Sequence, residues 1–337
     1  MKKTMRLCGQ KLSRSVSLGD VVGSPGGEGT VYRLKSMPQK VAKVYHAGKG
    51  SRRKLDAMLR HPPSDPMTKH GMVSIAWPTD VVCDQKGTFR GFLMPYIKGE
   101  TLYTLLSPKL RAEKHKGITY KHLLRIGRNL AASMEAIHDE GHYVSDVNSR
   151  NVVVNRRAVV TWIDCDSYHI TAGGKVFRCV CYVPQYTPPE HQGMNPRDYD
   201  TTVEHDRFGL AVLLFQLLME GIHPFEGSGP GKIHERITRS MWPYSSRTDH
   251  LRPRPASPTL EILHPELRYR FRRCFRRGLD SPERRPSCGS WKRALALAEH
   301  KTQRCPRVST HFFGDHLSSC PWCRRARGTI DFDSFPT

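Results

Sequence analysis

The chain has 337 residues, 38% of them hydrophobic and 9% aromatic, a composition that excludes a disordered protein and allows a sizeable core. The longest apolar stretch, residues 210–219, is shorter than the roughly 20 residues that span a bilayer, and no apolar segment follows the basic start, so we expect a cytoplasmic protein with no membrane partner. The formal net charge of +23 leaves nucleic acid or an acidic protein open as a partner, and we expect the ten cysteines to be reduced or metal-bound.

The first third of the chain predicts a small β-rich lobe. Residues 1–15 are polar and basic and predict a tail. Short β-prone runs surround a glycine-rich turn between residues 18 and 45, a short helix is expected over 51–59, and a hairpin follows over 75–97. We therefore place a small lobe at residues 16–96.

The chain then becomes helical and predicts a second, larger lobe over residues 97–300. An apolar stripe from Leu123 to Ile137 has helical spacing, and residues 206–220 predict a helix buried on most sides. Residues 301–330, rich in Cys, His and Arg, form a separate short module. The predicted fold class is therefore α+β, with two lobes and a small tail.

Arginines are concentrated in one predicted helix, residues 267–277. Leu267, Phe271, Cys274 and Phe275 recur at helical spacing and are expected to face a core, which leaves the arginines on the remaining surface. A solvated basic face explains this pattern, and a site for phosphate or nucleic acid is the alternative.

Two features near the start are typical of phosphate binding. Gly26, Gly27 and Gly29 lie between two β runs, where glycines let backbone N–H groups approach phosphate oxygens, although a flexible hairpin explains them equally well. Lys43 lies among apolar β-prone residues and needs an anionic partner such as a nucleotide phosphate, unless it sits on an edge strand.

The most specific pattern lies in the middle of the chain. Asp146 is followed five residues later by Asn151 and eighteen residues later by Asp164. Phosphoryl transfer needs a carboxylate near the acceptor hydroxyl, together with an amide oxygen and a second carboxylate that hold Mg²⁺ against the phosphates. These three residues supply those groups.

With this pattern the chain resembles the protein kinases over residues 15–298. The segment 181–190 resembles the end of a kinase activation segment, and Asp206 resembles the aspartate that braces the catalytic loop. Arg285 resembles the late arginine that pairs with an activation-segment glutamate, here Glu190. The forms Asp-Val-Asn-Ser-Arg-Asn, Ile-Asp-Cys-Asp-Ser and Cys-Pro-Trp-Cys are similar to the kinase of bacterial kinase–phosphatase–von Willebrand A triads found in tellurite-resistance-type loci.

The resemblance implies a serine/threonine kinase that binds ATP between its lobes and acts on a protein substrate, with a cognate phosphatase and a von Willebrand A protein as further partners. It implies that Asp146 orients and deprotonates the acceptor, Asn151 and Asp164 hold Mg²⁺, and Lys43 clamps the phosphates. The implied nucleotide contacts are the glycines of the turn, Val31, Ala42 and Val153 around adenine, and a hinge formed by Met94, Tyr96 and Ile97.

Several positions depart from the kinase pattern. Val144 and Ser145 replace the His-Arg before Asp146, Asn148 replaces the usual lysine, and Val183 replaces the threonine that contacts that lysine. These changes keep open a second interpretation, a nucleotide-binding pseudokinase scaffold. The four first-contact groups, Lys43, Asp146, Asn151 and Asp164, are intact and favour an active enzyme.

Two further departures concern Lys43 and the metal site. Asp166 stands where the metal-binding motif of kinases has glycine. The helix glutamate that should pair with Lys43 is missing, since Asp56 is the only acid of the predicted helix and Arg52 lies one turn earlier. The sequence therefore does not identify the acid that pairs with Lys43.

The C-terminal module predicts a structural zinc site. Cys320 and Cys323 form a Cys-x-x-Cys pair, which can place two thiolates on one Zn²⁺, and Cys305 with His311 would complete a tetrahedron. His316 is the alternative histidine. A redox-active pair is the competing interpretation, but the thioredoxin-like βαβ context that it needs is absent from the pattern.

Overall fold

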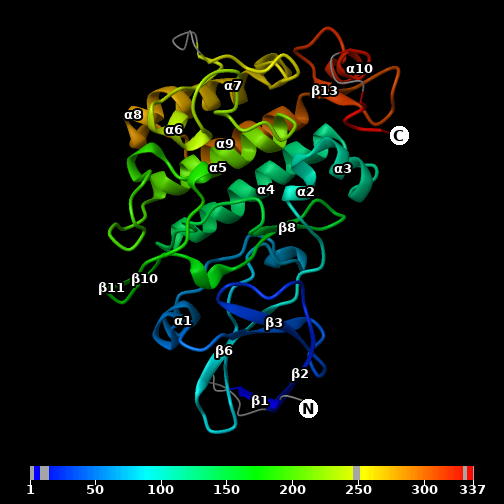
Figure 1. Ribbon diagram of the computed structural model, residues 1–337. Coiled ribbons are helices and arrows are strands. Elements are labelled where there is room, and N and C mark those ends of the chain that lie inside the picture. The colour runs from blue at the N-terminus through cyan, green and yellow to red at the C-terminus, as the bar shows by residue number, and fades with distance from the viewer. Residues whose placement is uncertain (1–3, 8–14, 246–250, 329–331, 337) are drawn as a thin grey trace.

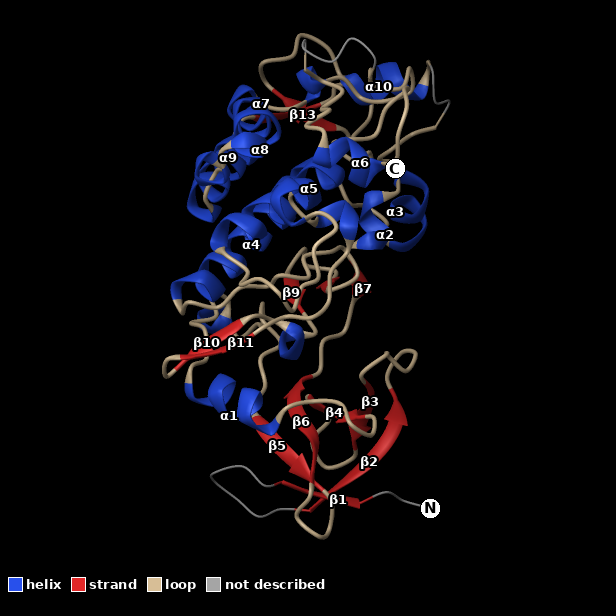
Figure 2. Cartoon of the chain, turned by 60° about the vertical axis from the view of Figure 1, so that its left-hand side comes forward, coloured by secondary structure: helices blue, strands red, loops and turns tan. Residues whose placement is uncertain are grey.

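A computed structural model describes residues 4–7, 15–245, 251–328 and 332–336. The first part of the chain builds a small lobe of strands with one helix, and the remainder builds a larger, mainly helical lobe (Figures 1 and 2). Within these residues, none of the helices combines the length and the apolar character needed to cross a bilayer.

The small lobe is a closed β-barrel with the strand order β1-β2-β3-β4-β6-β5. Its strands are β1 (Thr4–Leu7), β2 (Ser15–Val21), β3 (Gly29–Leu34), β4 (Lys40–Tyr45), β5 (Asp80–Cys83) and β6 (Phe89–Pro95). β1 closes the barrel by pairing with both β2 and β5, and Met5 is buried. The expected tail over residues 1–15 is therefore wrong for residues 4–7 and for Ser15, which begins β2; residues 1–3 and 8–14 lie outside the described chain.

One helix, α1 (Arg52–Arg60), lies against the barrel and contacts β10 of the large lobe (Figure 2). It begins where expected because the side chain of Ser51 accepts a hydrogen bond from the backbone N–H of Lys54. Leu55, Ala57 and Met58 are its buried residues. The helix therefore borders both lobes.

The large lobe contains helices around a small central sheet. Its helices are α2 (Tyr103–Leu106), α3 (Pro108–Lys114), α4 (Tyr120–Asp139), α5 (Val203–Leu218), α6 (Ile233–Thr238), α7 (Pro265–Arg272), α8 (Gly278–Asp280), α9 (Cys288–His300) and α10 (Pro321–Ala326), with a π-helical turn η6 (Arg273–Arg277). Its strands are β7 (Glu100–Thr101), β8 (Val152–Val154), β9 (Val160–Trp162), β10 (Ile170–Ala172), β11 (Lys175–Phe177), β12 (Thr302–Arg304) and β13 (Phe312–Gly314).

The core of this lobe lies where α4, α5 and α9 meet. α5 is buried along most of its length, as its continuous apolar sequence predicts. Gly127 of α4 permits the close approach, because a Cβ there would lie 2.9 Å from a methyl group of Leu214 in α5 and 3.3 Å from one of Leu295 in α9. A second glycine, Gly209 of α5, lets Val147 pack directly on that helix.

The C-terminal segment packs on the large lobe and does not form the separate module that the sequence predicted. Trp322 of α10 is buried, with its ring 4.9 Å from those of Tyr120 in α4 and of Phe335. Arg325 pairs with Glu220 at 2.6 Å. These contacts join residues 302–328 and 332–336 to the core of the large lobe, and residues 329–331 lie outside the described chain.

Candidate functional site

Hydrogen bonds to the start of α5 fix the loop between α4 and β8. Asp206, fully buried at the start of α5, accepts hydrogen bonds from the backbone N–H groups of Val144 (2.7 Å) and Ser145 (2.8 Å). His138 also contacts this carboxylate at 2.9 Å. The bracing role that the resemblance implied for Asp206 agrees with these contacts. Ser145 has a positive φ of 63°, which these bonds help to maintain.

Asp146 presents one carboxylate oxygen that has no partner within the described residues. Its Oδ2 accepts a hydrogen bond from Asn151 Nδ2 at 2.8 Å, whereas its Oδ1 is buried and makes no hydrogen bond there. Burial raises the pKa of the Asp146 carboxyl, and hydrogen bonds from Asn151 and Asn148 oppose this shift. An acceptor of this kind suits an incoming hydroxyl group.

Asn148 takes a structural role where kinases have lysine. Its Oδ1 accepts hydrogen bonds from the backbone N–H groups of Arg150 (2.9 Å) and Asn151 (3.2 Å), and its Nδ2 donates to the carbonyl of Asp146. The side chain therefore closes the loop on itself. Val183 lines the same cavity as Asn148.

Lys43 on β4 meets two carboxylates from the segment after β9. Its Nζ lies 3.0 Å from Asp164 Oδ1 and 2.8 Å from Asp166 Oδ1. Burial alone would lower the pKa of Lys43, but the charges of Asp166 and Asp164 outweigh it and hold this pKa well above its ordinary value. The structure thus brings together Lys43 and Asp164, two of the residues that the sequence singled out.

Asp166 is the functional residue that the sequence did not assign. In the sequence, Asp166 is noticeable only because it stands where the metal-binding motif of kinases has glycine. Asp56 and Arg52, the residues considered near the missing glutamate, instead pair with each other along the outer face of α1 at 2.9 Å. The acid that contacts Lys43 besides Asp164 is therefore Asp166.

The strand register corrects one of the residues expected around adenine. Val31 pairs with Lys43 across β3 and β4, and Val41 pairs with Met94 across β4 and β6. Side chains alternate along a strand, so Val41 and Lys43 share one face of β4, whereas Ala42 points to the other. Ala42 indeed packs in the barrel core with Leu93. Val41, and not Ala42, therefore shares the face of β4 that carries Lys43.

The other expected nucleotide contacts lie at the boundary between the lobes. Tyr96 and Ile97 are half-buried in the connection from β6 to β7, and Val153 of β8 is buried but lies outside the hydrophobic core clusters that contain its neighbours Val152 and Val154. The Arg33 guanidinium stacks on the Tyr96 ring at 3.7 Å.

The glycines of the β2–β3 turn differ in what they do. Gly29 belongs to β3, where a Cβ would lie 2.6 Å from the Val44 carbonyl, so close packing of two strands already requires glycine. Gly26 and Gly27 are exposed in the turn. The charge of Glu28, beside them, acts on Tyr45 and Lys54, which places this turn near the Lys43 site.

Glu190 and Arg285 form the pair that the resemblance implied. The guanidinium makes two hydrogen bonds to the carboxylate, of 2.6 and 2.7 Å, and the Arg285 side chain is completely buried. Burial would raise the pKa of Glu190, but Arg285 lowers it below its usual value. This pair fixes the end of the segment that runs from Asp164 to Glu190.

A cavity of about 590 Å³ opens beside the catalytic loop. The loop contributes Asn148, Ser149 and Arg150, and the opposite wall includes Val183 and Tyr186. The hollow begins at Asn148, two residues after Asp146, and its volume lies in the range of ligand-binding pockets.

The donor groups fit Mg²⁺ and a nucleotide. The Asp164 side chain is half exposed and Asn151 supplies an amide oxygen, which are the hard oxygen ligands that Mg²⁺ prefers. Lys43 brings a cation to the same place. These residues would hold the metal and the phosphates, and the bound metal would neutralise charge on the phosphate oxygens.

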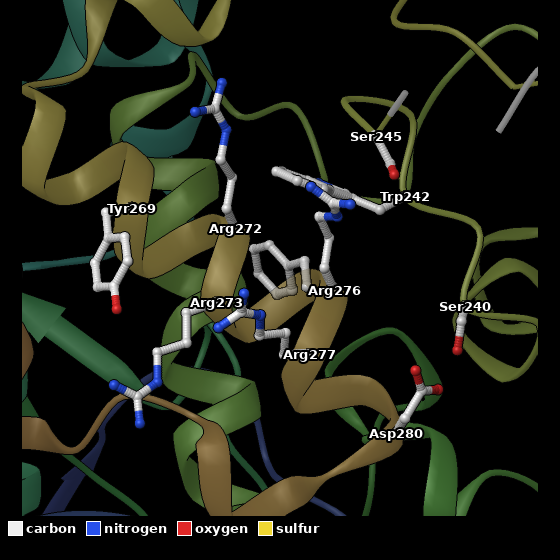
Figure 3. Close-up of a pocket in the computed structure, with 10 residues that line it drawn as sticks. Ser240, Trp242, Ser245, Tyr269, Arg272, Arg273, Arg276, Arg277 and Asp280 are labelled. Atoms are coloured by element: carbon white, nitrogen blue, oxygen red, sulfur yellow. The ribbon is translucent and has the colours of Figure 1, made fainter. Parts of the chain in front are cut away.

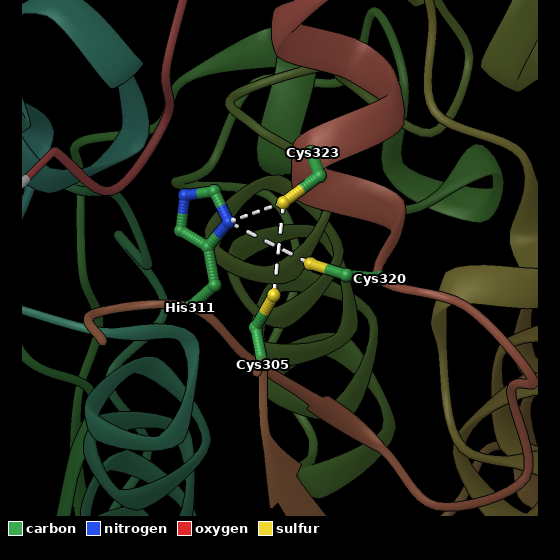
Figure 4. A group of neighbouring side chains, drawn as sticks. All are labelled: Cys305, His311, Cys320 and Cys323. Atoms are coloured by element: carbon green, nitrogen blue, oxygen red, sulfur yellow. Dashed lines mark hydrogen bonds between the residues drawn. The ribbon is translucent and has the colours of Figure 1, made fainter. Parts of the chain in front are cut away.

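A second cluster of donors lies at the C-terminus, where Cys305, His311, Cys320 and Cys323 place their ligand atoms within 4.8 Å of one another (Figure 4). Cys305 Sγ lies 3.6 Å from Cys323 Sγ, and His311 Nδ1 lies 3.4 Å from Cys323 Sγ. A tetrahedral zinc ion with bonds of about 2.3 Å to sulfur separates its ligands by roughly 3.5–3.8 Å, so the cluster matches that geometry.

The surroundings of this cluster distinguish the two histidines. His311 is buried, and its Nε2 contacts Asp333 Oδ1 at 2.7 Å, the carboxylate partner that metal-bound histidines commonly have. His316 instead directs its Nε2 to the carbonyl of Glu261. The structure therefore brings together the four residues chosen from the sequence and leaves the alternative histidine aside.

The basic helix has the expected buried face and borders a cavity of about 540 Å³ (Figure 3). Leu267, Phe271, Cys274 and Phe275 are all buried. The cavity is lined by four arginines of α7 and η6, by the buried Trp242 and by several further side chains. The arginines are Arg272, Arg273, Arg276 and Arg277, and the further side chains include Ser240, Ser245, Tyr269 and Asp280.

The comparisons with known proteins agree with this geometry. Residues 75–292 match the family model described as "Protein kinase domain". "Protein kinase YegI" of Escherichia coli strain K12 is 32% identical over 317 residues, which cover 91% of this chain and 48% of that protein. YegI of E. coli O157:H7 is 32% identical over 308 residues, with 88% and 47% covered.

A plant protein is more distantly similar. "CBL-interacting protein kinase 1" of Oryza sativa subsp. japonica is 25% identical over 169 residues, which cover 48% of this chain and 34% of that protein. The chain spans about half the length of the YegI proteins.

Proposed function

Because this chain belongs to the protein kinase family, we propose that it transfers the γ-phosphoryl group of Mg²⁺-bound ATP to a serine or threonine hydroxyl of a protein substrate. The family also confirms the expected fold class, a two-lobed α+β kinase fold. The observation that carries the proposal is the meeting of Lys43 with Asp164, 121 residues apart, beside Asp146 and Asn151.

The proposed step balances as follows. The acceptor hydroxyl donates its proton to Asp146 while its oxygen attacks the γ-phosphorus, and the bond between that phosphorus and the bridging oxygen of ADP breaks. Asn151 and Asp164 hold Mg²⁺, and Lys43 contacts the phosphates. The resemblance to the tellurite-locus kinases supports a cognate phosphatase and a von Willebrand A protein as partners.

One experiment separates this function from a pseudokinase scaffold. Purified protein is incubated with γ-labelled ATP and Mg²⁺, and phosphorylated residues are located. We expect transfer that needs Mg²⁺ and that Asp164→Asn abolishes, because this change removes charge from a metal ligand without removing core volume. Turnover that is unchanged in Asp164→Asn would refute the metal assignment, and nucleotide binding without transfer by the wild type would favour the scaffold.

For the C-terminal cluster we propose one structural Zn²⁺ held by Cys305, His311, Cys320 and Cys323. The ligand separations, the burial of His311 and its contact with Asp333 support this assignment.

A second candidate function, binding of nucleic acid or an acidic partner, rests on the basic cavity of Figure 3. The side chains of Arg272, Arg276 and Arg277 make no ion pair within the described chain. If the cavity binds anionic polymers, affinity for DNA, RNA or a polyglutamate peptide falls steeply with salt in the wild type. Arg272→Gln/Arg276→Gln should weaken it, whereas Arg268→Gln on the same helix should not.

A further inference from the structure

Both carboxylate oxygens of Asp166 contact side chains of β4 in the small lobe. Oδ1 lies 2.8 Å from Lys43 Nζ, and Oδ2 accepts a hydrogen bond of 2.8 Å from the Tyr45 hydroxyl. Its side chain is 2% exposed, whereas that of Asp164 is 50% exposed. Asp164 therefore has an oxygen accessible to a metal, and Asp166 is committed to holding β4.

The acid of α1, Asp56, pairs with Arg52 of the same helix and not with Lys43. Both side chains of this pair are partly exposed to solvent, Asp56 at 35% and Arg52 at 40%. Lys54 lies three and four residues before the buried Ala57 and Met58 of α1, so it lies on the same inward side of the helix as they do. Its side chain is partly buried, and burial lowers its pKa. A lysine thus occupies the inward face of α1, and the charge of Asp166 acts on it.

We propose that Asp166 is the positioning residue for Lys43, in place of an acid on α1, and that Lys54 occupies the inward α1 position from which this acid is missing. The inference rests on the proposed phosphotransfer, in which Lys43 contacts the phosphates.

The arrangement has a consequence for how the site assembles. The carboxylate that holds Lys43 lies two residues from Asp164, so the metal ligand and the lysine partner belong to one short segment, η2 (Cys165–Ser167) and its preceding residue. If Asp164 held Mg²⁺, Asp166 would still be available to hold Lys43. Neither of these carboxylates lies on α1, so the contacts that hold Lys43 would not require an acid from that helix.

The test compares two acid-to-amide changes of equal charge, Asp166→Asn and Asp56→Asn. We expect Asp166→Asn to lower kcat/KM for ATP about a hundredfold, on the order expected when a buried, hydrogen-bonded ion pair loses one charge. Asp56→Asn should stay within about twofold, because its pair is solvent-exposed. Tyr45→Phe, which removes one hydrogen bond to Asp166, should have an intermediate effect of less than about tenfold. Equal effects of Asp166→Asn and Asp56→Asn would overturn the proposal.

Calorimetric Kd values for Mg-ATP, measured on the same proteins, separate this inference from the proposed function. If the wild type binds but does not transfer phosphate, the proposed function fails, yet Asp166→Asn must still weaken Mg-ATP binding by about tenfold or more relative to Asp56→Asn. Unchanged affinity would overturn the inference by itself. Melting curves identify any variant that fails to fold.

Moving the charge provides a further check. In the Asp166→Asn protein, Lys54→Glu should restore at least part of the lost kcat/KM, about tenfold, because it places a carboxylate on the inward face of α1 and removes a competing ammonium group. In the wild type the same Lys54→Glu change should bring no gain. Absence of recovery in the double variant would contradict the assignment of Lys54.

Discussion

Arg285 holds Glu190 with two hydrogen bonds of 2.6 and 2.7 Å, joining segments that lie 95 residues apart. The same guanidinium donates to the carbonyls of Gly278 (2.7 Å) and Glu204 (3.0 Å). One fully buried side chain therefore connects the activation segment, the start of α5 and the turn before α9.

We predict that Arg285→Gln lowers the free energy of unfolding by about 3–5 kcal/mol, because it leaves the Glu190 carboxylate partly buried without its counter-charge. The adjacent Arg284→Gln is the matched control; its side chain is 56% exposed and should change stability by no more than about 0.5 kcal/mol. Urea unfolding of both variants measures the difference, and similar values for the two would contradict the structural role of the pair.

Asp146→Ala should abolish phosphotransfer but leave the Kd for Mg-ATP within about threefold of the wild type. The physical reason follows from the proposed function: Asp146, whose Oδ1 has no partner among the described residues, would accept the proton of the hydroxyl, whereas Lys43 and Asp164 would hold the phosphates. Calorimetry and a transfer assay check the two halves. An equal loss of nucleotide affinity would show that Asp146 belongs to the nucleotide site.

The sequence predicted the contacts that depend on residue type within a short motif. Asp206 and the pair of Glu190 with Arg285 were found in this way, because each motif appears in its expected order. The contact of Asp166 with Lys43 was not found in this way, since the two residues lie 123 positions apart and Asp166 takes the place of an acid expected on a different element, the helix α1. Ala42 was assigned wrongly because a shift of one residue along a strand reverses the face to which a side chain points.

The remaining errors have a similar cause. β1 consists of only four residues, and its pairing with β5 depends on a register that local pattern does not encode. The packing of the C-terminal segment on α4 depends on single aromatic residues, Trp322 and Phe335, that meet Tyr120 from distant parts of the chain. Tertiary contacts of this kind leave no periodic signal.

His138 makes stability depend on pH. Burial would lower its pKa, but the hydrogen bonds to Asp206 and Cys288 outweigh it and raise the pKa to about 10. Since the folded pKa lies above the ordinary value, the stabilising contribution is complete below about pH 6.5 and is lost as pH rises towards 10.

The stability difference between the wild type and His138→Leu should therefore be largest near pH 6, on the order of a few kcal/mol, and should shrink steadily by pH 9.5. Urea unfolding at a series of pH values provides the measurement. A difference that is constant or that grows with pH would show that His138 is not protonated in its contact with Asp206.

Zinc removal should affect more than the C-terminal segment. From composition alone, we would expect chelation to disorder the tail and leave the lobes folded. In the structure, however, Cys305, Phe313, Trp322 and Phe335 belong to the same hydrophobic cluster as the helices of the large lobe. Binding of a structural zinc ion is coupled to folding and is worth about 10 kcal/mol or more in small zinc modules, so its loss should also weaken that cluster.

We expect freshly purified protein to contain one zinc ion per chain by elemental analysis, and His311→Ala to lose it. His316→Ala is the matched control and should retain it, because His316 directs its Nε2 to the carbonyl of Glu261, away from the thiols. In the zinc-free protein, Tm should fall by several degrees for the whole large lobe, since Trp322 packs 4.9 Å from Tyr120 of α4. A zinc content well below one would refute the site. Full zinc content with an unchanged Tm after chelation would instead show that aromatic packing alone holds this segment on the lobe.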